Sequence, residues 1–139
     1  AHELHMAAAE REVPPAQYEV GLMLERGLGC MQNYSEAAFW YEEAAKRGHL
    51  EAFNNLGVLY KEGHGVEKDE AKSFICFTRA SNGGLAQGHY NLGLLYDQGI
   101  GCESDNDKAL DLCRKAAYAG HKKAKEIIQG LQEDGKIVF

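Results

Sequence analysis

Histidines and cysteines are the side chains of this chain that could bind a metal ion, and the sequence contains six and four of them, respectively. His2 and His5 are three residues apart, whereas the zinc-binding helix motif places its two histidines at i and i+4. No third ligand lies near them in the sequence. His49 and His121 each follow a glycine and are expected to take part in turns. We therefore predict no metal site and no cofactor.

Two glycine-rich segments, residues 63–66 and 99–102, have the composition of phosphate-binding loops. Phosphate-binding loops follow a β-strand and occur once in a domain, whereas these segments recur and follow predicted helices. Catalysis would require a nucleophile beside a base, or paired carboxylates in a cleft. The sequence contains no such constellation, so no catalytic residue is predicted and the chain is expected not to be an enzyme.

The glycines define a repeat, because four sets of them recur every 36 residues. These sets are Gly21, Gly57 and Gly93; Gly27, Gly63 and Gly99; Gly29, Gly65 and Gly101; and Gly48, Gly84 and Gly120. A fixed period in this range is typical of stacked supersecondary units. The predicted boundaries are the second helix of an upstream repeat at residues 1–13, repeat 1 at 14–49, repeat 2 at 50–85, repeat 3 at 86–121, and a partial fourth repeat or C-terminal cap at 122–139. Because the first of these is half a repeat, the sequence is expected to be a segment of a longer protein.

Each repeat is predicted to consist of two helices, and repeat 2 shows the pattern most clearly. Apolar residues at helical spacing predict a first helix over residues 52–62. Gly63 ends this helix, and the turn from Gly63 to Gly65 is expected to need a positive φ, which glycine adopts without steric cost. Asp69, at a position that holds Asn or Asp in every repeat, provides the N-cap of a second helix. The chain is therefore predicted to be all-α, an α/α superhelix in the form of a right-handed solenoid of antiparallel helix pairs.

A glycine recurs in the middle of each first helix, at Gly21, Gly57 and Gly93. Glycine in a helix interior costs about 1 kcal/mol relative to alanine, so a compensating contact is expected. Small residues recur on the second helices, at Ala44, Ala80 and Ala116. We predict that these alanines face the glycines and allow the two helices to approach closely.

The charge balance argues against two classes of partner. Lys and Arg number 15 against 21 Asp and Glu, so the net charge is −6, and the two signs are interspersed. Nucleic acids and anionic membranes require clustered positive charge, and the sequence has no cluster beyond Lys122, Lys123 and Lys125. No apolar run approaches the roughly 20 residues that span a bilayer. We predict no nucleic-acid partner and no direct membrane insertion.

The four cysteines are predicted to be free thiols. Cys30 and Cys102 occupy the same position two repeats apart, which is roughly 20 Å in a stack of helix layers and beyond disulfide reach. Cys76 and Cys113 lie one repeat apart, and a bridge between them is geometrically unfavourable. Because free thiols favour a reducing compartment, a cytoplasmic location is expected.

The repeated strings of the chain resemble a known family. The strings are NLGVLYKEGHGVEKDEAKSF in repeat 2, NLGLLYDQGIGCESDNDKAL in repeat 3 and EVGLMLERGLGCMQNYSEAAFWYEEAAKRGH in repeat 1. They are similar to Sel-one-like repeats (SLR), the 36-residue relatives of tetratricopeptide repeats, over roughly residues 14–121. Further along, Gln129 and Ile137 replace two of the repeat glycines, which leaves open a partial fourth repeat or a cap.

In tetratricopeptide-like arrays the first helix of each repeat lines a concave groove, so the resemblance implies a peptide- or protein-binding groove of twelve residues. These residues are Tyr18, Glu19, Leu22 and Glu25 in repeat 1; Asn54, Asn55, Val58 and Lys61 in repeat 2; and Tyr90, Asn91, Leu94 and Asp97 in repeat 3. Asn55 and Asn91 share a position, and an asparagine amide can both donate to and accept from a peptide backbone. Alternatively, these asparagines bond to their own or a neighbouring helix backbone. Tyr18 and Tyr90 would add flat contact area.

The resemblance implies a protein–protein interaction adaptor or scaffold that holds a protein or an extended peptide in this groove. The repeat pattern, the acidic mixed-charge composition and the lack of a catalytic constellation are consistent with that function. An alternative is a regulatory or targeting module of a larger enzyme whose catalytic domain lies outside this segment. Self-association through the incomplete terminal repeats also stays open.

Overall fold

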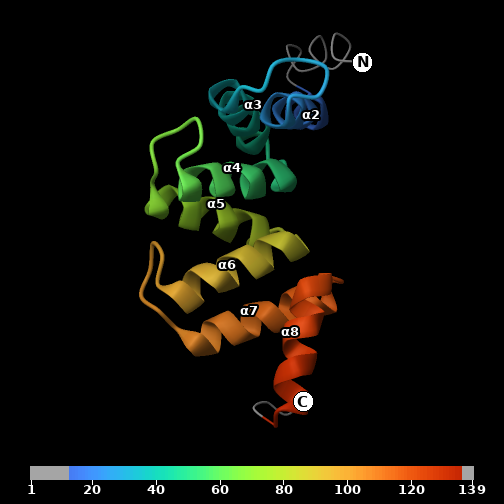
Figure 1. Ribbon diagram of the computed structural model, residues 1–139, viewed down its shortest axis with the longest axis vertical. Helices are drawn as coiled ribbons and strands as arrows, with labels where there is room; N and C mark the ends of the chain where they lie inside the picture. Colours follow the sequence, from blue (N-terminus) through green and yellow to red (C-terminus); the bar gives the residue numbers. More distant parts are fainter. Residues whose placement is uncertain (1–12, 136–139) are drawn as a thin grey trace.

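The computed structural model describes residues 13–135, so the predicted upstream helix falls outside the described residues, as do residues 136–139. The described part contains seven α-helices and no strand, which confirms the all-α prediction. The helices are α2 (Pro14–Arg26), α3 (Tyr34–Lys46), α4 (Leu50–Glu62), α5 (Glu70–Asn82), α6 (Ala86–Gln98), α7 (Asn106–Tyr118) and α8 (Lys122–Glu133). They stack along the long axis of the molecule, with α2 and α3 near one end and α8 near the other (Figure 1).

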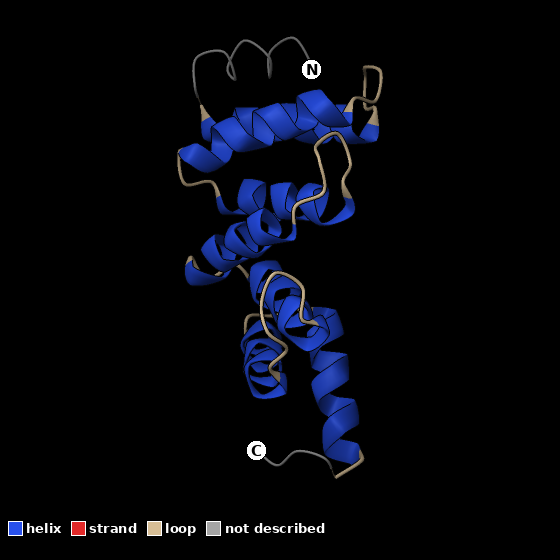
Figure 2. Cartoon of the chain, turned by 90° about the vertical axis from the view of Figure 1, so that its left-hand side faces the viewer, coloured by secondary structure: helices blue, strands red, loops and turns tan. Residues whose placement is uncertain are grey.

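Three helical hairpins form the stack: α2 with α3, α4 with α5, and α6 with α7. Loops of seven residues join the two helices of a hairpin, and loops of three residues join one hairpin to the next. Each second helix also packs on the first helix of the following hairpin, and α7 packs on α8 in the same way. The side view in Figure 2 shows the described residues as a stack of helices joined by loops. Because each hairpin contacts only its neighbours in sequence, the described chain is an α-solenoid.

Local sequence signals determine where the helices begin and end. The side chains of Asn33, Asp69 and Asp105 accept hydrogen bonds from the backbone amides three residues later, at 3.0, 3.0 and 3.1 Å, and cap α3, α5 and α7. Gly63 ends α4 with a φ of +72°, and Gly65 has a φ of +75°. The predicted caps and the predicted left-handed turn are confirmed.

The mid-helix glycines of repeats 1 and 2 lie against aromatic rings. A Cβ added to Gly21 would lie 2.5 Å from the ring of Tyr41, and one added to Gly57 would lie 2.8 Å from the ring of Phe77. Tyr41 and Phe77 are 0% and 1% exposed, so these rings form the centre of their hairpins. The glycines therefore allow an aromatic ring of the second helix to pack directly on the backbone of the first.

The recurring alanines make a different contact from the predicted one. Ala44, Ala80 and Ala116 are all fully buried. A Cβ added to Gly88, at the start of α6, would lie 2.7 Å from the methyl group of Ala80. The prediction that the alanines face the mid-helix glycines is wrong, because aromatic rings lie nearest to Gly21 and Gly57, and other residues of α7 lie nearest to Gly93. Ala80 instead allows α5 to approach the first helix of the next repeat.

Repeat 3 lacks the aromatic ring of this arrangement. Cys113 stands 36 residues after Phe77 and 72 after Tyr41, at the same position of the repeat. A Cβ added to Gly93 would meet its nearest neighbours, on Ala109 and Leu112 of α7, at 3.3 Å. In repeat 3, therefore, no ring lies on the mid-helix glycine, and the atoms nearest to Gly93 belong to α7 itself.

Candidate functional site

The twelve residues expected to line a groove lie on the three first helices, four each on α2, α4 and α6. We call the surface that they form the first-helix face. Eleven of them are at least partly exposed, whereas Asn54 is buried, with 6% exposure. Asn54 thus supports this face from beneath.

The asparagine pair of the first-helix face is held by other side chains. Asn91 Nδ2 donates a 2.8 Å hydrogen bond to Asn54 Oδ1, which links α6 to α4. Asn55 Nδ2 donates to the Tyr41 hydroxyl at 3.4 Å. Both of these bonds go to side chains, so they differ from the bonds to helix backbone that were the alternative. Their use as contacts to a peptide stays a prediction.

A chain of polar groups continues from this pair to the end of the stack. Gln87 Nε2 donates to Asn91 Oδ1 at 3.4 Å, and Gln87 Oε1 lies 2.9 Å from His121 Nε2. His121 Nδ1 accepts from the Ala124 amide at 3.1 Å, so Nε2 carries the proton and donates to Gln87. This chain ties α4, α6 and the start of α8 together along one side of the molecule.

Two histidines cap helices and also support the tyrosines of the first-helix face. His49 Nδ1 accepts from the Ala52 amide at 3.2 Å and caps α4, as His121 caps α8. The His49 ring lies 4.7 Å from the Tyr18 ring, and the His121 ring stacks on the Tyr90 ring at 4.3 Å. The expected turn role is confirmed.

The sequence analysis missed the pairing of these histidines with the tyrosines. The signal was present, because repeats 1 and 3 carry both a tyrosine and a histidine at these positions. Repeat 2 carries neither and has Asn54 and Leu85 instead.

We expect the melting temperature to fall as the pH is lowered from 7 through the lowered pKa values of these histidines. Burial lowers the pKa of His49 below 6.5, against smaller opposing effects of Glu51 and Glu19, and burial and then Lys123 lower the pKa of His121. Below pH 6.5 these histidines bind protons in the unfolded chain that they do not bind in the folded chain. Their contribution to stability is therefore fully present above pH 6.5 and is lost as the pH falls. Thermal unfolding monitored by circular dichroism at pH 7.5, 6.5 and 5.5 measures the loss.

The matched variant for this prediction is the double substitution His49→Asn and His121→Asn, which retains an N-cap acceptor without a titrating ring. It is expected to reduce the pH-dependent drop, and the exposed-turn control His64→Asn is expected to retain it. An equally steep drop in the double variant would contradict the assignment.

The hydroxyl of Tyr41 connects the first-helix face to the core. Tyr41 Oη donates a 2.8 Å hydrogen bond to Glu25 Oε1, and it also accepts from Asn55. Burial raises the pKa of Tyr41 far above its ordinary value, so the hydroxyl stays protonated and acts as a donor. The carboxylate of Glu25 is thereby fixed at the edge of the face.

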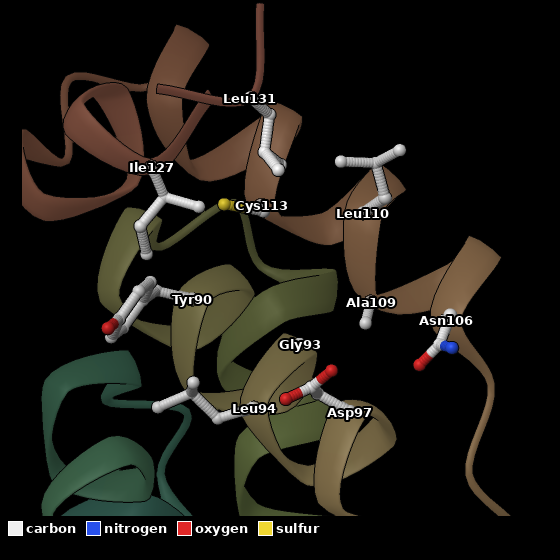
Figure 3. A pocket seen from close by; sticks show the side chains of 10 residues that line it. All are labelled: Tyr90, Gly93, Leu94, Asp97, Asn106, Ala109, Leu110, Cys113, Ile127 and Leu131. Carbon is white, nitrogen blue, oxygen red and sulfur yellow. The ribbon is translucent and has the colours of Figure 1, made fainter. Parts of the chain in front are cut away.

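A cavity of about 590 Å³ opens between α6, α7 and α8. Three of the twelve predicted residues line it, together with residues of α7 and α8 that the sequence analysis did not single out. The lining includes Tyr90, Leu94 and Asp97 of α6, Cys113 of α7, and Ile127 and Leu131 of α8. Figure 3 shows Tyr90 and Ile127 on one side of the cavity and Asp97 with Asn106 on the other. The sequence signal for it was Cys113 at a position that holds a ring in the other repeats.

The cysteines are free thiols in the structure. Burial raises the pKa of Cys76 to about 12 and also raises the pKa of Cys113, which faces the cavity. Both groups are therefore neutral thiols near pH 7 and behave as small apolar side chains.

Neither a metal cluster nor a membrane-spanning helix is found in the part of the chain that the structure describes. Within residues 13–135, no group of three or more His, Cys, Asp or Glu side chains is arranged to hold a metal ion. None of the helices in that range combines the length and apolar character needed to cross a membrane. His2 and His5 lie outside the described residues.

Stacked helical hairpins with a face of tyrosine, amide and carboxylate side chains define an α-solenoid repeat protein. Within that class, the sequence matches the Sel1 repeat at residues 14–49, 51–85 and 86–121, and the chain belongs to this family. The resemblance drawn from the sequence is confirmed. Sel1 repeat proteins generally mediate protein–protein interactions and are typically non-catalytic scaffolds.

Solved structures of Sel1 repeat proteins resemble the chain closely. A protective antigen of uropathogenic Escherichia coli strains with an SLR fold is 34% identical with a TM-score of 0.89, and the match covers 96% of this chain and 28% of that one. A Sel1 repeat protein from Oxalobacter formigenes is 30% identical with a TM-score of 0.82, covering 93% of this chain and 53% of that one. The chain therefore spans about a quarter to a half of the length of these proteins.

A third solved structure supports the fold alone. Helicobacter pylori cysteine rich protein B is 24% identical with a TM-score of 0.65, covering 69% of this chain and 73% of that one. No curated protein shows significant sequence similarity to the chain.

Proposed function

We propose that this chain is an adaptor or scaffold segment that binds a protein partner through an extended peptide laid along the first-helix face. The observation that carries the proposal is the cavity at the α6 end of this face, lined by Tyr90, Leu94 and Asp97. A concave, mostly apolar cavity with a few polar groups is the usual form of a ligand site. A binding face that shares residues with such a cavity is suited to a peptide with one anchoring side chain.

The tyrosines of the face are suited to binding because they are already held in place. Tyr18 and Tyr90 are partly exposed, and each packs on a histidine ring that also caps a helix. Tyrosine is enriched at sites that dominate binding energy, and a preordered ring loses little conformational entropy when a partner binds. We infer that these two rings contact apolar parts of the partner.

The amides of the face are suited to a peptide backbone. An asparagine NH2 group carries two hydrogens, so Asn91 can donate one to Asn54 and the other to a peptide carbonyl. Asn55 can divide its two donors between Tyr41 and a peptide in the same way. Since both amides are oriented before binding, each peptide hydrogen bond is formed at a small entropic cost.

The charges of the face favour a basic peptide. Glu19, Glu25 and Asp97 are opposed by Lys61 alone among the twelve residues, and the whole chain has a net charge of −6. Complementary charges guide association and select against acidic partners. Binding is therefore expected to weaken as salt is added.

Replacing Asn55, Tyr90 and Asn91 together with alanine is expected to lower the affinity for a partner captured from a lysate by about 100-fold. The loss of two hydrogen bonds of about 1 kcal/mol each and of one aromatic contact accounts for this magnitude. Isothermal titration calorimetry with the purified partner measures the change.

The control for this triple variant carries Phe39→Ala, Asn82→Ala and Tyr118→Ala, which are exposed residues of α3, α5 and α7. This control is expected to bind like the parent. Unchanged affinity of the first triple variant, with an intact helical spectrum, would show that the first-helix face is not the binding surface.

We also propose a binding role without catalysis and a reducing, cytoplasmic location for the chain. Both follow from the residues already described: the first-helix face offers binding groups, and the four thiols are free. Labelling the thiols in intact cells with a membrane-permeable maleimide would test the location. Blocked thiols before reduction would contradict it.

A further inference from the structure

Repeat 1 shows what a ring does at the position that is open in repeat 3. The ring of Tyr41 packs on Gly21 and lies 5.9 Å from the ring of Tyr18. Its hydroxyl donates to Glu25 Oε1 at 2.8 Å. Four groups therefore form one arrangement: a glycine under the ring, a tyrosine beside it, a carboxylate at its hydroxyl, and the ring itself.

Repeat 3 retains three of these four groups. Gly93, Tyr90 and Asp97 stand 72 residues after their counterparts in repeat 1, and all three line the cavity. Only the ring is missing, because Cys113 replaces Tyr41. The cavity thus lies at the repeat position of the Tyr41 ring, and Asp97 stands at the repeat position of the carboxylate that accepts from the Tyr41 hydroxyl.

Repeat 2 lacks both the hydroxyl and the carboxylate that are paired in repeat 1. Its ring is Phe77, which has no hydroxyl, and Lys61 stands at the position of Glu25 and Asp97. A carboxylate is therefore present in repeat 1, where a hydroxyl needs an acceptor, and in repeat 3, where no ring of the second helix fills the position.

We propose that the cavity between α6, α7 and α8 receives a tyrosine side chain of the partner, a proposal that rests on the proposed function. The tyrosine ring packs on Gly93 beside Tyr90, and its hydroxyl donates to the carboxylate of Asp97, as Tyr41 does to Glu25. The neutral thiol of Cys113 and the side chain of Ile127 form the apolar surroundings of the ring. The partner therefore completes the third hairpin with a ring that the chain itself lacks.

The test uses p-cresol, the side-chain analogue of tyrosine, and toluene, the analogue of phenylalanine, titrated into the full chain. Amide shifts in 1H–15N NMR spectra report binding. We expect saturable shifts at Gly93, Asp97 and Cys113, with p-cresol binding roughly tenfold more tightly than toluene because a hydrogen bond to a charged acceptor is added. Toluene binding as tightly as p-cresol in the parent would overturn the proposal.

Two variants separate the ring site from the hydroxyl contact. Asp97→Ala, a change at an exposed side chain, is expected to abolish the preference for p-cresol and leave toluene binding unchanged. Cys113→Tyr is expected to fill the cavity and abolish binding of both probes. Retention of the p-cresol preference in Asp97→Ala would overturn the proposal even if Cys113→Tyr failed to fold.

Two further results distinguish this proposal from its alternatives. Phe139 of the chain itself could supply a ring, and a tenfold gain in p-cresol affinity on Phe139→Ala would show that it does and would overturn the proposal.

Loss of partner affinity in the Asn55, Tyr90 and Asn91 variant, with no p-cresol binding by the parent, would reject the tyrosine proposal alone. Saturable p-cresol binding by the parent, with unchanged partner affinity in that variant, would reject the proposed peptide path and, because Tyr90 lines the cavity, the partner tyrosine as well.

Discussion

Replacing Tyr41 with alanine is expected to lower the free energy of unfolding by about 3–5 kcal/mol. The ring is fully buried and packs on the backbone at Gly21, so its removal leaves a hole that the rigid hairpin cannot close. The substitution also leaves Glu25 and Asn55 without the hydroxyl that they share. Chemical unfolding in guanidinium chloride, followed by circular dichroism at 222 nm, measures the change.

The variant Tyr41→Phe separates packing from hydrogen bonding in this prediction. It retains the ring and removes the hydroxyl, so a loss of about 1 kcal/mol is expected. Adding a ring to repeat 3 with Cys113→Tyr is expected to preserve or raise stability, because the cavity is already open at that position. A loss below 1 kcal/mol in Tyr41→Ala would show that the ring is not central to the hairpin.

Replacing Gly57 with leucine is expected to cost about 3 kcal/mol or more through overpacking. Even the Cβ of the new side chain would lie 2.8 Å from the Phe77 ring, and that ring is 1% exposed. Helices α4 and α5 would have to separate, which would disturb the middle of the stack. The same unfolding measurement reports the loss.

Alanine at the corresponding positions provides a matched pair that differs in a single contact. Gly57→Ala is expected to destabilise the chain by about 1–3 kcal/mol, because the clash with the Phe77 ring exceeds the gain in helix propensity. Gly93→Ala is expected to lie within about 1 kcal/mol of the parent, because its Cβ would meet α7 at 3.3 Å and no ring covers it. Equal losses in the two variants would contradict the packing account.

Several features of this protein are determined by interactions between residues close together in the sequence. The capping side chains Asn33, Asp69 and Asp105 bond to amides only three residues away, and the glycine turns depend on the φ of single residues. Such interactions act within one helix or one turn, so the sequence predicts them without knowledge of the packing. The 36-residue period then indicates a stack, since similar hairpins bury their apolar sides against one another.

The contacts between helices could not be predicted in the same way. The recurring alanines and the aromatic residues both lie on the second helices, and only the rotation and crossing of the packed helices decide which of them meets a mid-helix glycine. Asn54 shares its repeat position with Tyr18 and Tyr90, but its shorter side chain is buried and accepts a hydrogen bond from Asn91 of the next repeat. A position in the repeat therefore predicts on which side of the helix a residue lies. How much of its side chain is exposed depends on the residues of the neighbouring repeat.

The features of the candidate site can be separated in the same way, into those set by the sequence and those set by the packing of the helices. The sequence by itself determined the all-α stack, its period, its helix caps and the first helices on which the predicted binding residues lie. Only the tertiary structure decided that Tyr90, Cys113 and Ile127, from three different helices, surround one cavity. The physical reason is that a cavity forms where an expected side chain is missing from a packed layer, and its shape depends on how rigidly the surrounding helices hold their places.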